Sequence, residues 1–254
     1  MKVLYFSATG NCLYVAKRLG GELLSIPQLQ KKGIYEITGD VVGIVCPVYG
    51  FTLPNLVKEY LEKATIKAEY VFSIMTFGNL SIAALTQMKK AFEKQGVQLH
   101  YSNQIRMVDN YLPIFEVSSQ LKKNKDESIE VKINNIVSDI KERKQSCVKH
   151  GGFQKSISNI ISALWGNKKM VNKRDNNFTV SELCNGCGTC RNVCPVGNIA
   201  GSGKPEYQHR CEFCLACIHL CPKNAIHLKN ERSDKRFINP HVKLSELIQA
   251  NKQD

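Results

Sequence analysis

The chain has 254 residues and a formal net charge of +13, a length that allows one large domain or two smaller ones. The first apolar run ends at Ser7 and is too short for a secretory signal peptide, and no apolar stretch approaches the roughly 20 residues of a membrane helix. We therefore expect a protein of the reducing cytoplasm without a membrane span, in which clustered cysteines bind metal instead of forming disulfides.

The first predicted element is a strand over residues 2–6, which leads through a hydroxyl-rich loop into a helix over residues 13–19. The loop consists of Ser7, Ala8, Thr9, Gly10, Asn11 and Cys12. Amide groups and the dipole at a helix N-terminus favour a bound anion, and the loop side chains add hydrogen-bond donors. The loop has neither the G-x-G-x-x-G pattern of dinucleotide-binding folds nor the Lys of a P-loop. We interpret it as a site for the phosphate of FMN, with a plain strand-to-helix turn as the alternative.

Strands and helices alternate through the next hundred residues. Strands are predicted over residues 41–46, 70–77 and 97–107, and helices from about residue 54, over 81–94 and over 118–144. This alternation predicts a parallel α/β sheet. Ligands of such sheets bind beyond the carboxyl ends of the strands, so the loops at residues 7, 47 and 76 should converge. Cys46 ends an apolar strand, and we expect a buried, inert thiol there.

A basic segment follows the predicted sheet. Residues 146–180 hold five Lys and one Arg against a single Asp. Apolar residues recur at helical spacing within it: Ile157, Ile160, Ile161, Leu164 and Trp165. We expect this helical face to pack against one of the domains, with a membrane surface as the alternative. The basic charge favours an acidic redox protein as partner over nucleic acid, for which the chain has no recognition motif.

The cysteines are concentrated near the C-terminus: eight of eleven lie in residues 184–221. Two runs share the pattern C-x2-C-x2-C-x3-C-P and are offset by 27 residues: Cys184, Cys187, Cys190 and Cys194, then Cys211, Cys214, Cys217 and Cys221. A constant offset indicates an internal duplication. Three closely spaced thiolates can surround one corner of a cubane, whereas the fourth ligand must come from elsewhere. Zinc is the alternative, but it would leave the third and fourth cysteines of each run without a use.

These runs resemble those of bacterial two-cluster ferredoxins, in which the fourth Cys of each run binds the other cluster. The resemblance implies two 4Fe-4S clusters with crossed ligands. One set is Cys184, Cys187, Cys190 and Cys221, and the other is Cys211, Cys214, Cys217 and Cys194. Two oxidised clusters and one FMN phosphate would offset part of the positive charge.

With its N-terminal pattern, the whole chain resembles a flavodoxin-like domain fused to a two-cluster ferredoxin, an arrangement common in anaerobes. This implies a doubly wound parallel α/β sheet followed by a small ferredoxin-like α+β domain. Residues 7–12 match the flavodoxin phosphate loop T/S-x-T-G-N-T except at Cys12, where a thiol is a poorer donor than a threonine hydroxyl.

By the same resemblance, two further loops would enclose the isoalloxazine ring of FMN. They are Pro47, Val48, Tyr49, Gly50 and Phe51, and Thr76, Phe77, Gly78 and Asn79. Tyr49, Phe51 or Phe77 would stack on the ring, with an ordinary core position as the alternative for the two phenylalanines. Gly50, Gly78 or Asn79 would present amides to the ring nitrogens. Tyr111 is expected to anchor a surface loop instead of covering the flavin.

We divide the chain into an FMN-binding domain (1–146), a basic connection (147–180), a ferredoxin domain (181–230) and a tail (231–254). The tail predicts a short helix with Asn239 as its N-cap and Pro240 in the first turn. The expected function is electron transfer between FMN and the clusters in one chain. The alternative is an FMN-dependent reductase of a small molecule that receives electrons through the clusters.

Overall fold

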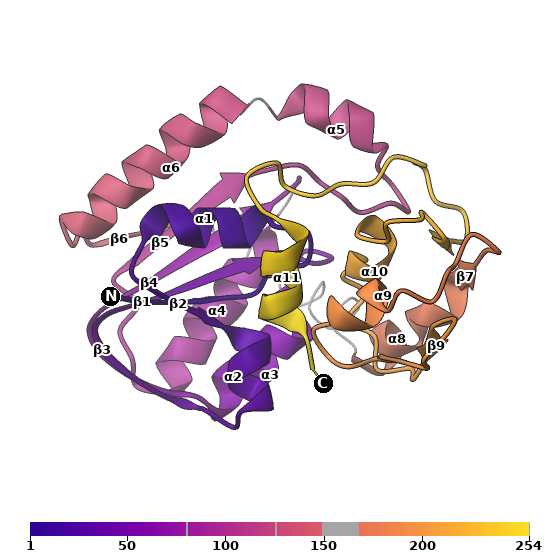
Figure 1. The fold of residues 1–254 in the computed structure, drawn as a ribbon. Helices are drawn as coiled ribbons and strands as arrows, with labels where there is room; N and C mark the ends of the chain where they lie inside the picture. The colour runs from indigo at the N-terminus through magenta and orange to yellow at the C-terminus, as the bar shows by residue number, and fades with distance from the viewer. Residues whose placement is uncertain (80, 125, 149–167, 254) are drawn as a thin grey trace.

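The computed structural model describes residues 1–79, 81–124, 126–148 and 168–253. In these residues a six-stranded sheet has the order β2-β1-β3-β4-β5-β6 (Figure 1). Its strands are β1 (Lys2–Tyr5), β2 (Glu22–Ser25), β3 (Glu36–Pro47), β4 (Thr65–Phe77), β5 (Tyr101–Arg106) and β6 (Ser146–Cys147). All neighbours in this sheet are parallel, and the first five strands follow the 2-1-3-4-5 order of flavodoxin-like folds. The doubly wound α/β fold expected for the N-terminal part is thereby confirmed.

The long strands β3 and β4 form the centre of the sheet, where both faces are covered. Their apolar residues run almost without interruption, as is typical of buried parallel strands. Cys46 is fully buried at the end of β3, as expected, and burial raises the pKa of its thiol well above the usual value. Gly43 pairs with Phe72, and a Cβ at Gly43 would lie 1.9 Å from the Phe72 ring. The glycine therefore leaves room for this ring in the core.

Helices cover both faces of the sheet (Figure 1). One face carries α1 (Asn11–Leu19) and α6 (Asp126–Lys141), which buries a stripe of isoleucines. The other carries α2 (Ile26–Lys31), α3 (Asn55–Lys63) and α4 (Ile82–Lys94). The short elements β2 and α2 have no counterpart among the predicted elements. None of the helices in the described ranges has the length and apolar character needed to cross a membrane.

The single helix predicted over residues 118–144 is wrong in its extent. The structure has two helices there, α5 (Val117–Lys123) and α6, and Asn124 leaves the helical conformation at the end of α5 with φ −111° and ψ 86°. The Glu116 carboxylate accepts from the amides of Ser118 and Ser119 and so begins α5. Residues 122–128 hold no apolar side chain, and the break between the two helices lies in this polar stretch.

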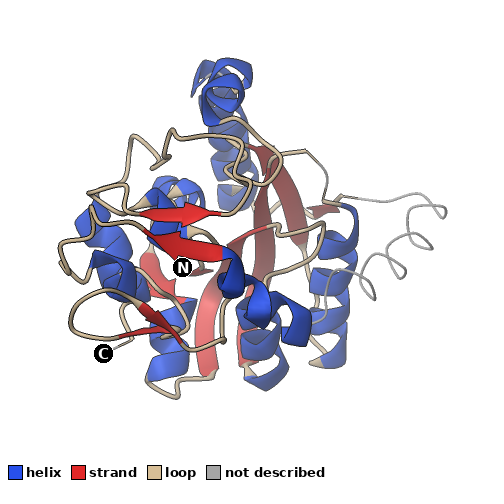
Figure 2. Cartoon of the chain, turned by 90° about the vertical axis from the view of Figure 1, so that its right-hand side faces the viewer, coloured by secondary structure: helices blue, strands red, loops and turns tan. Residues whose placement is uncertain are grey.

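The cysteine-rich region is small and built from short elements (Figure 2). These are α8 (Lys168–Asn172), a 3-10 turn η1 (Lys173–Asn177), β7 (Phe178–Val180), α9 (Thr189–Asn192), β8 (Ile199–Ala200), β9 (Glu206–Tyr207), α10 (Ala216–His219) and β10 (Ile226–Leu228). β7 pairs with β10 and β8 with β9, both antiparallel. This is the small ferredoxin-like region expected after the sheet. β7 lies before residue 181, and the apolar residues 157–165 of the connection lie outside the described residues.

The tail returns from the cysteine-rich region to the sheet domain, where α11 (Leu244–Asn251) packs near α2 and α9 (Figure 1). The helix begins four residues later than predicted from Asn239 and Pro240. Its start is stabilised by the Glu246 carboxylate, which accepts from the Lys243 amide at 2.7 Å. Asn239 instead binds the loop before α1, because its backbone amide donates to the Thr9 carbonyl at 2.8 Å. The tail thus joins the two regions of the chain.

Candidate functional site: a cavity between the sheet and the cysteine loops

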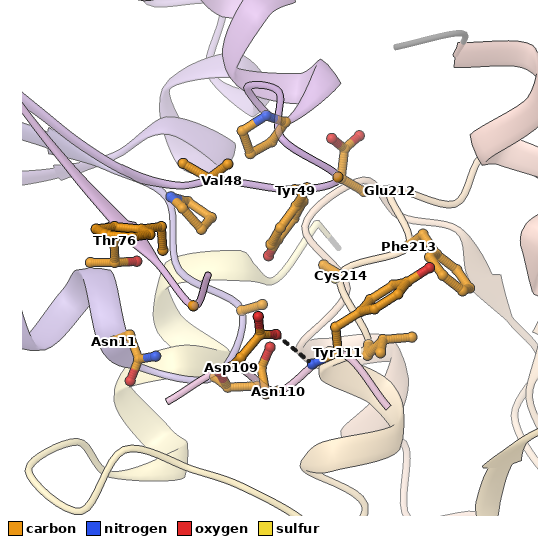
Figure 3. A pocket seen from close by; sticks show the side chains of 18 of the residues that line it. Asn11, Val48, Tyr49, Thr76, Asp109, Asn110, Tyr111, Glu212, Phe213 and Cys214 are labelled. Atoms are coloured by element: carbon orange, nitrogen blue, oxygen red, sulfur yellow. Dashed lines mark hydrogen bonds between the residues drawn. The ribbon is translucent and has the colours of Figure 1, made fainter. Parts of the chain in front are cut away.

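A cavity of about 320 Å³ lies where the carboxyl ends of the strands face the cysteine-rich region (Figure 3). All predicted residues of the three loops line it except Gly10. They are Ser7, Ala8, Thr9, Asn11, Cys12, Pro47, Val48, Tyr49, Gly50, Phe51, Thr76, Phe77, Gly78 and Asn79. Its volume lies in the range of small-molecule sites in proteins, and its walls combine aromatic and polar side chains. The structure therefore brings together loops that are about 40 and 70 residues apart along the chain.

Gly10 faces away from the cavity, toward the tail. Its φ is +106°, and a Cβ there would lie 2.8 Å from Cβ of Asn239. A side chain at this position would displace Asn239. The backbone amide of Asn239 donates to the Thr9 carbonyl, and its side-chain Nδ2 donates to Oδ1 of Asn11 at 3.1 Å. Glycine is therefore required here by the close approach of the tail.

The loop before α1 has hydroxyl groups in position to bind an anion. Ser7 and Thr9 are buried, and each accepts a hydrogen bond at its side-chain oxygen, from the Gly10 amide and from Nδ2 of Asn110 respectively. Each O–H hydrogen is therefore left to donate to a ligand. Among the described residues, no side chain caps α1, and its first turn holds no acidic residue. The first amides of α1 and these two hydroxyls fit a phosphate group.

Cys12, the departure from the flavodoxin pattern, is held by another loop of the cavity. Its Sγ lies 3.1 Å from Oγ1 of Thr76. Burial raises the pKa of the Cys12 thiol to about 12, so the group stays neutral. The thiol thus connects the phosphate-loop side of the cavity to the end of β4.

The aromatic side chains around the cavity are partly exposed to it. Phe51 and Phe77 are half-buried and line the cavity, so neither occupies a closed core position. Phe51 has a left-handed backbone with φ +69°. Tyr49 contacts Phe6 edge to face, with ring centroids 6.0 Å apart. Tyr111 lies in the loop after β5 and also lines the cavity.

Sequence reasoning missed the polar group that follows β5. Asp109 lines the cavity, and its carboxylate accepts from the Tyr111 amide at 3.1 Å and from Nδ2 of Asn79 at 3.4 Å. Burial raises the pKa of this carboxyl. A Cβ on Gly78 would lie 2.0 Å from Oδ2 of Asp109, so glycine is needed for these two loops to meet. The sequence signal that could have identified Asp109 was its position just after a strand of the parallel sheet, where ligands of such sheets bind.

The opposite wall comes from the second cysteine run. Glu212, Phe213 and Cys214 line the cavity (Figure 3). Leu215 and Arg174 also line it. Glu212 is buried, and burial raises the pKa of its carboxyl to about 7, although it accepts from the Leu56 amide at 3.3 Å. No local pattern marks these residues as neighbours of the phosphate loop, because the contact depends on how the two regions pack.

The cysteine thiols fall into two neighbouring groups. Burial raises the pKa of Cys190 to about 11, and negative charge on Cys221, Cys187 and Cys184 contributes to the increase. Burial also raises the pKa of Cys217, with contributions from Cys211, Cys214, Cys194 and then Cys190. Thiols that influence each other in this way lie close together in space. Among the described residues, no three His, Cys, Asp or Glu side chains are arranged to hold a single metal ion.

Backbone amides are directed at the sulfur atoms. The amides of Asn198, Phe213 and Ala225 donate to Sγ of Cys194, Cys211 and Cys221 at 3.2, 3.2 and 3.3 Å respectively. Amide donors of this kind stabilise the negative charge of thiolate ligands and help to set the potential of an iron-sulfur cluster. The donor set therefore fits clusters with thiolate ligands.

His219 connects the cysteine-rich region to the cavity. The Phe237 amide donates to Nδ1 of His219 at 3.2 Å, so the ring hydrogen is on Nε2, which donates to the Asn110 carbonyl at 2.8 Å. Burial lowers the pKa of this imidazole to about 4, which keeps it neutral at pH 7. The neutral ring therefore supports a fixed contact between α10 and the loop after β5.

Comparisons with known proteins agree with the cysteine pattern. A family model described as a 4Fe-4S binding domain matches residues 179–200. An uncharacterised ferredoxin of Methanocaldococcus jannaschii is 38% identical over 71 residues, which cover 24% of this chain and 88% of that protein. The solved structure of the Trp repressor binding protein from Bacillus subtilis aligns with a TM-score of 0.31 and 11% identity, over 41% of this chain and 83% of that one. Through its cysteine-rich region, the chain belongs to the ferredoxin family.

Proposed function

We propose that the chain is an electron-transfer protein that holds FMN in the cavity and two 4Fe-4S clusters on the crossed cysteine sets. The construction of the cavity carries this proposal: loops at the carboxyl ends of the strands form one wall, and the second cysteine run forms the other. When bound, FMN accepts electrons in pairs and releases them singly, whereas each cluster carries one electron at a time. We place the chain in the flavodoxin–ferredoxin fusion family on this basis.

The phosphate-loop residues support FMN in particular. Ser7 and Thr9 each present a hydroxyl donor, and α1 presents uncapped amides, so a monophosphate can be bound without a cationic side chain. The aromatic and glycine residues at the ends of β3 and β4 are available to the flavin ring. Asp109 and Asn110 hold these loops together from the end of β5.

The grouping of the thiols supports crossed ligation. Cys190 is influenced by Cys221 of the second run, and Cys217 by Cys194 of the first. A short loop can place three thiolates on one cluster, and a fourth from the other run also ties the two halves of this small region together.

The first cysteine run lies toward the outside of the molecule and is the proposed contact with an external redox partner. Cys187 is exposed, and Leu183, which directly precedes Cys184, has 65% of its surface exposed. The positive charge of the chain favours an acidic partner protein, in the reducing cytoplasm in which clusters are kept. Cytosolic thiols are available for such clusters because they are not oxidised to disulfides.

Anaerobic stopped-flow spectroscopy of the reconstituted full chain tests this proposal. Reduction of the flavin should be followed by loss of cluster absorbance, at a rate that does not change with protein concentration, because both cofactors are in one chain. A transfer rate proportional to protein concentration would show that electrons pass between molecules. Failure of the parent protein to bind FMN would contradict the flavin site itself.

One observation favours a second function, the reduction of a small molecule at the flavin. Asp109 has a partly buried carboxyl with a raised pKa on the cavity wall, which makes it the candidate proton donor to a substrate. Under this alternative, Asp109→Asn should slow oxidation of the reduced protein by that substrate, while leaving electron transfer to the clusters unchanged. If every oxidant tested oxidises the reduced parent and the reduced variant at equal rates, the reductase function is contradicted and the carrier function remains.

A further inference from the structure

The duplicated cysteine runs both have left-handed backbone at two matching positions, but with different residues there. Gly186 and Gly188 have φ of +72° and +75°, and their counterparts 27 residues later, Phe213 and Leu215, have φ of +53° and +59°. Left-handed backbone is easily adopted by glycine and is unfavourable for residues with a Cβ. The second run therefore retains two large side chains at a conformational cost that the first run avoids.

Both side chains lie on the wall of the cavity. Leu215 is also part of the apolar core of the cysteine-rich region, with 3% of its surface exposed, so packing accounts for it. Phe213 is only half-buried and lines the cavity. Packing in a core alone therefore does not account for phenylalanine at this position.

The ring of Phe213 is held by three neighbouring side chains, of which Tyr111 and Arg174 also line the cavity. It stacks with Phe178 at a centroid distance of 5.9 Å and an interplanar angle of 16°. Tyr111 contacts it edge to face at 5.9 Å, and the Arg174 guanidinium lies 5.0 Å from its centroid. A half-buried aromatic ring on the cavity wall that is already fixed by several neighbours can contact a planar aromatic ligand without losing much side-chain freedom.

We propose that Phe213 is a flavin-binding residue: the second cysteine loop forms a wall of the flavin site, and the Phe213 ring contacts the isoalloxazine. This inference rests on the proposed FMN site and adds a residue from outside the flavodoxin-like domain. It also makes the cluster on Cys211, Cys214, Cys217 and Cys194 the one beside the flavin, because Phe213 lies between two of its ligands. Flavin binding and the integrity of this loop should consequently depend on each other.

Fluorescence titration of the cluster-loaded full chain with FMN and with riboflavin tests the proposal. Phe213→Leu keeps an apolar side chain but removes the ring, and it should raise the dissociation constants of both flavins by about tenfold. Phe237→Leu is the matched control, because Phe237 is buried in the same apolar cluster but does not line this cavity. It should leave both dissociation constants unchanged, and iron content should be equal in all three proteins.

The outcomes separate this proposal from the proposed function. If the parent binds FMN and Phe213→Leu binds both flavins equally well, the wall assignment is wrong and the FMN site stands. If Phe213→Leu weakens FMN but not riboflavin, the side chain acts on the phosphate end and the ring contact is wrong. Absence of FMN binding by the parent would instead remove the proposed function.

A second variant covers the case in which Phe213→Leu loses its clusters. Phe213→Trp keeps an aromatic ring and, in a Trp165→Phe background, supplies the single indole of the chain. Saturating FMN should quench most of its emission, because the indole would be in contact with the flavin. Unchanged emission at saturation would overturn the proposal.

Discussion

Removal of the Thr9 hydroxyl should weaken the binding of FMN and leave that of riboflavin almost unchanged. Thr9 has 3% of its surface exposed, and its Oγ1 accepts from Nδ2 of Asn110, which leaves the hydroxyl hydrogen for the ligand. Only FMN carries the phosphate that would accept this hydrogen. Thr9→Ala should therefore distinguish the two flavins.

The size of the effect follows from burial of the donor. Loss of one buried hydrogen bond to a charged acceptor costs about 1 to 3 kcal/mol, so the dissociation constant of FMN should rise about 5- to 150-fold. In the variant, the side-chain amide of Asn110 loses Oγ1 of Thr9 as its acceptor. This side chain is only half-buried, so water can replace the contact. Thr9→Ser retains the hydroxyl and should keep most of the affinity.

Titration of flavin fluorescence under anaerobic conditions measures both ligands on the same preparation. Ser102→Ala is a matched control, because this buried hydroxyl accepts from the Val148 amide at 3.0 Å and is outside the cavity. It should change neither affinity. Equal losses of FMN and riboflavin in Thr9→Ala would refute the phosphate assignment, since the change would then act on the fold or on the ring site.

Four further outcomes are expected. Anaerobically reconstituted protein should contain about eight Fe and eight sulfide per chain, whereas stoichiometric zinc without sulfide in freshly isolated protein would contradict the clusters. Cys194→Ser should alter the spectrum of the cluster on residues 211–217, and damage confined to the other cluster would rule out crossed ligation. FMN should bind more tightly below the raised pKa of Asp109 and lose affinity as the pH rises through it, because enclosure by the ligand disfavours the ionised carboxylate. Asp109→Asn should abolish that pH dependence in flavin titrations, and a parallel dependence in both proteins would exclude Asp109 as its source. Gly43→Ala should lower the free energy of unfolding by about 1 to 3 kcal/mol through overpacking against Phe72, and an unchanged melting temperature would contradict this.

Several features could be predicted from the sequence because they depend on neighbouring residues. Apolar runs of the length of a strand, alternating with helical spacing, were sufficient to predict the parallel sheet. The loop from Ser7 to the start of α1 could be identified because its chemistry is contained in six consecutive residues. Boundaries were predicted less well: one helix was expected over residues 118–144, yet Asn124 ends the first of two helices.

The tail shows how tertiary contacts replaced a local preference. Asn239 and Pro240 have the residue types of a helix start, but Asn239 binds Thr9 and Asn11 of the loop before α1. The helix begins instead at Leu244, where Glu246 can accept from the Lys243 amide. The spacing of residue types within the tail could not predict a hydrogen-bond partner more than 200 residues away in the chain.

By itself, the sequence determined the alternation of strands and helices, the loop suited to a phosphate and the duplicated cysteine runs, since each is encoded within a few tens of residues. Only the tertiary structure decided that the second cysteine run, and not the first, faces the carboxyl ends of the strands. That choice depends on packing between the two regions, which share apolar clusters, and on the tail that joins them. The same packing gives Phe213 a position on the cavity wall, whereas its counterpart Gly186 lies away from the cavity with Gly203 as its neighbour.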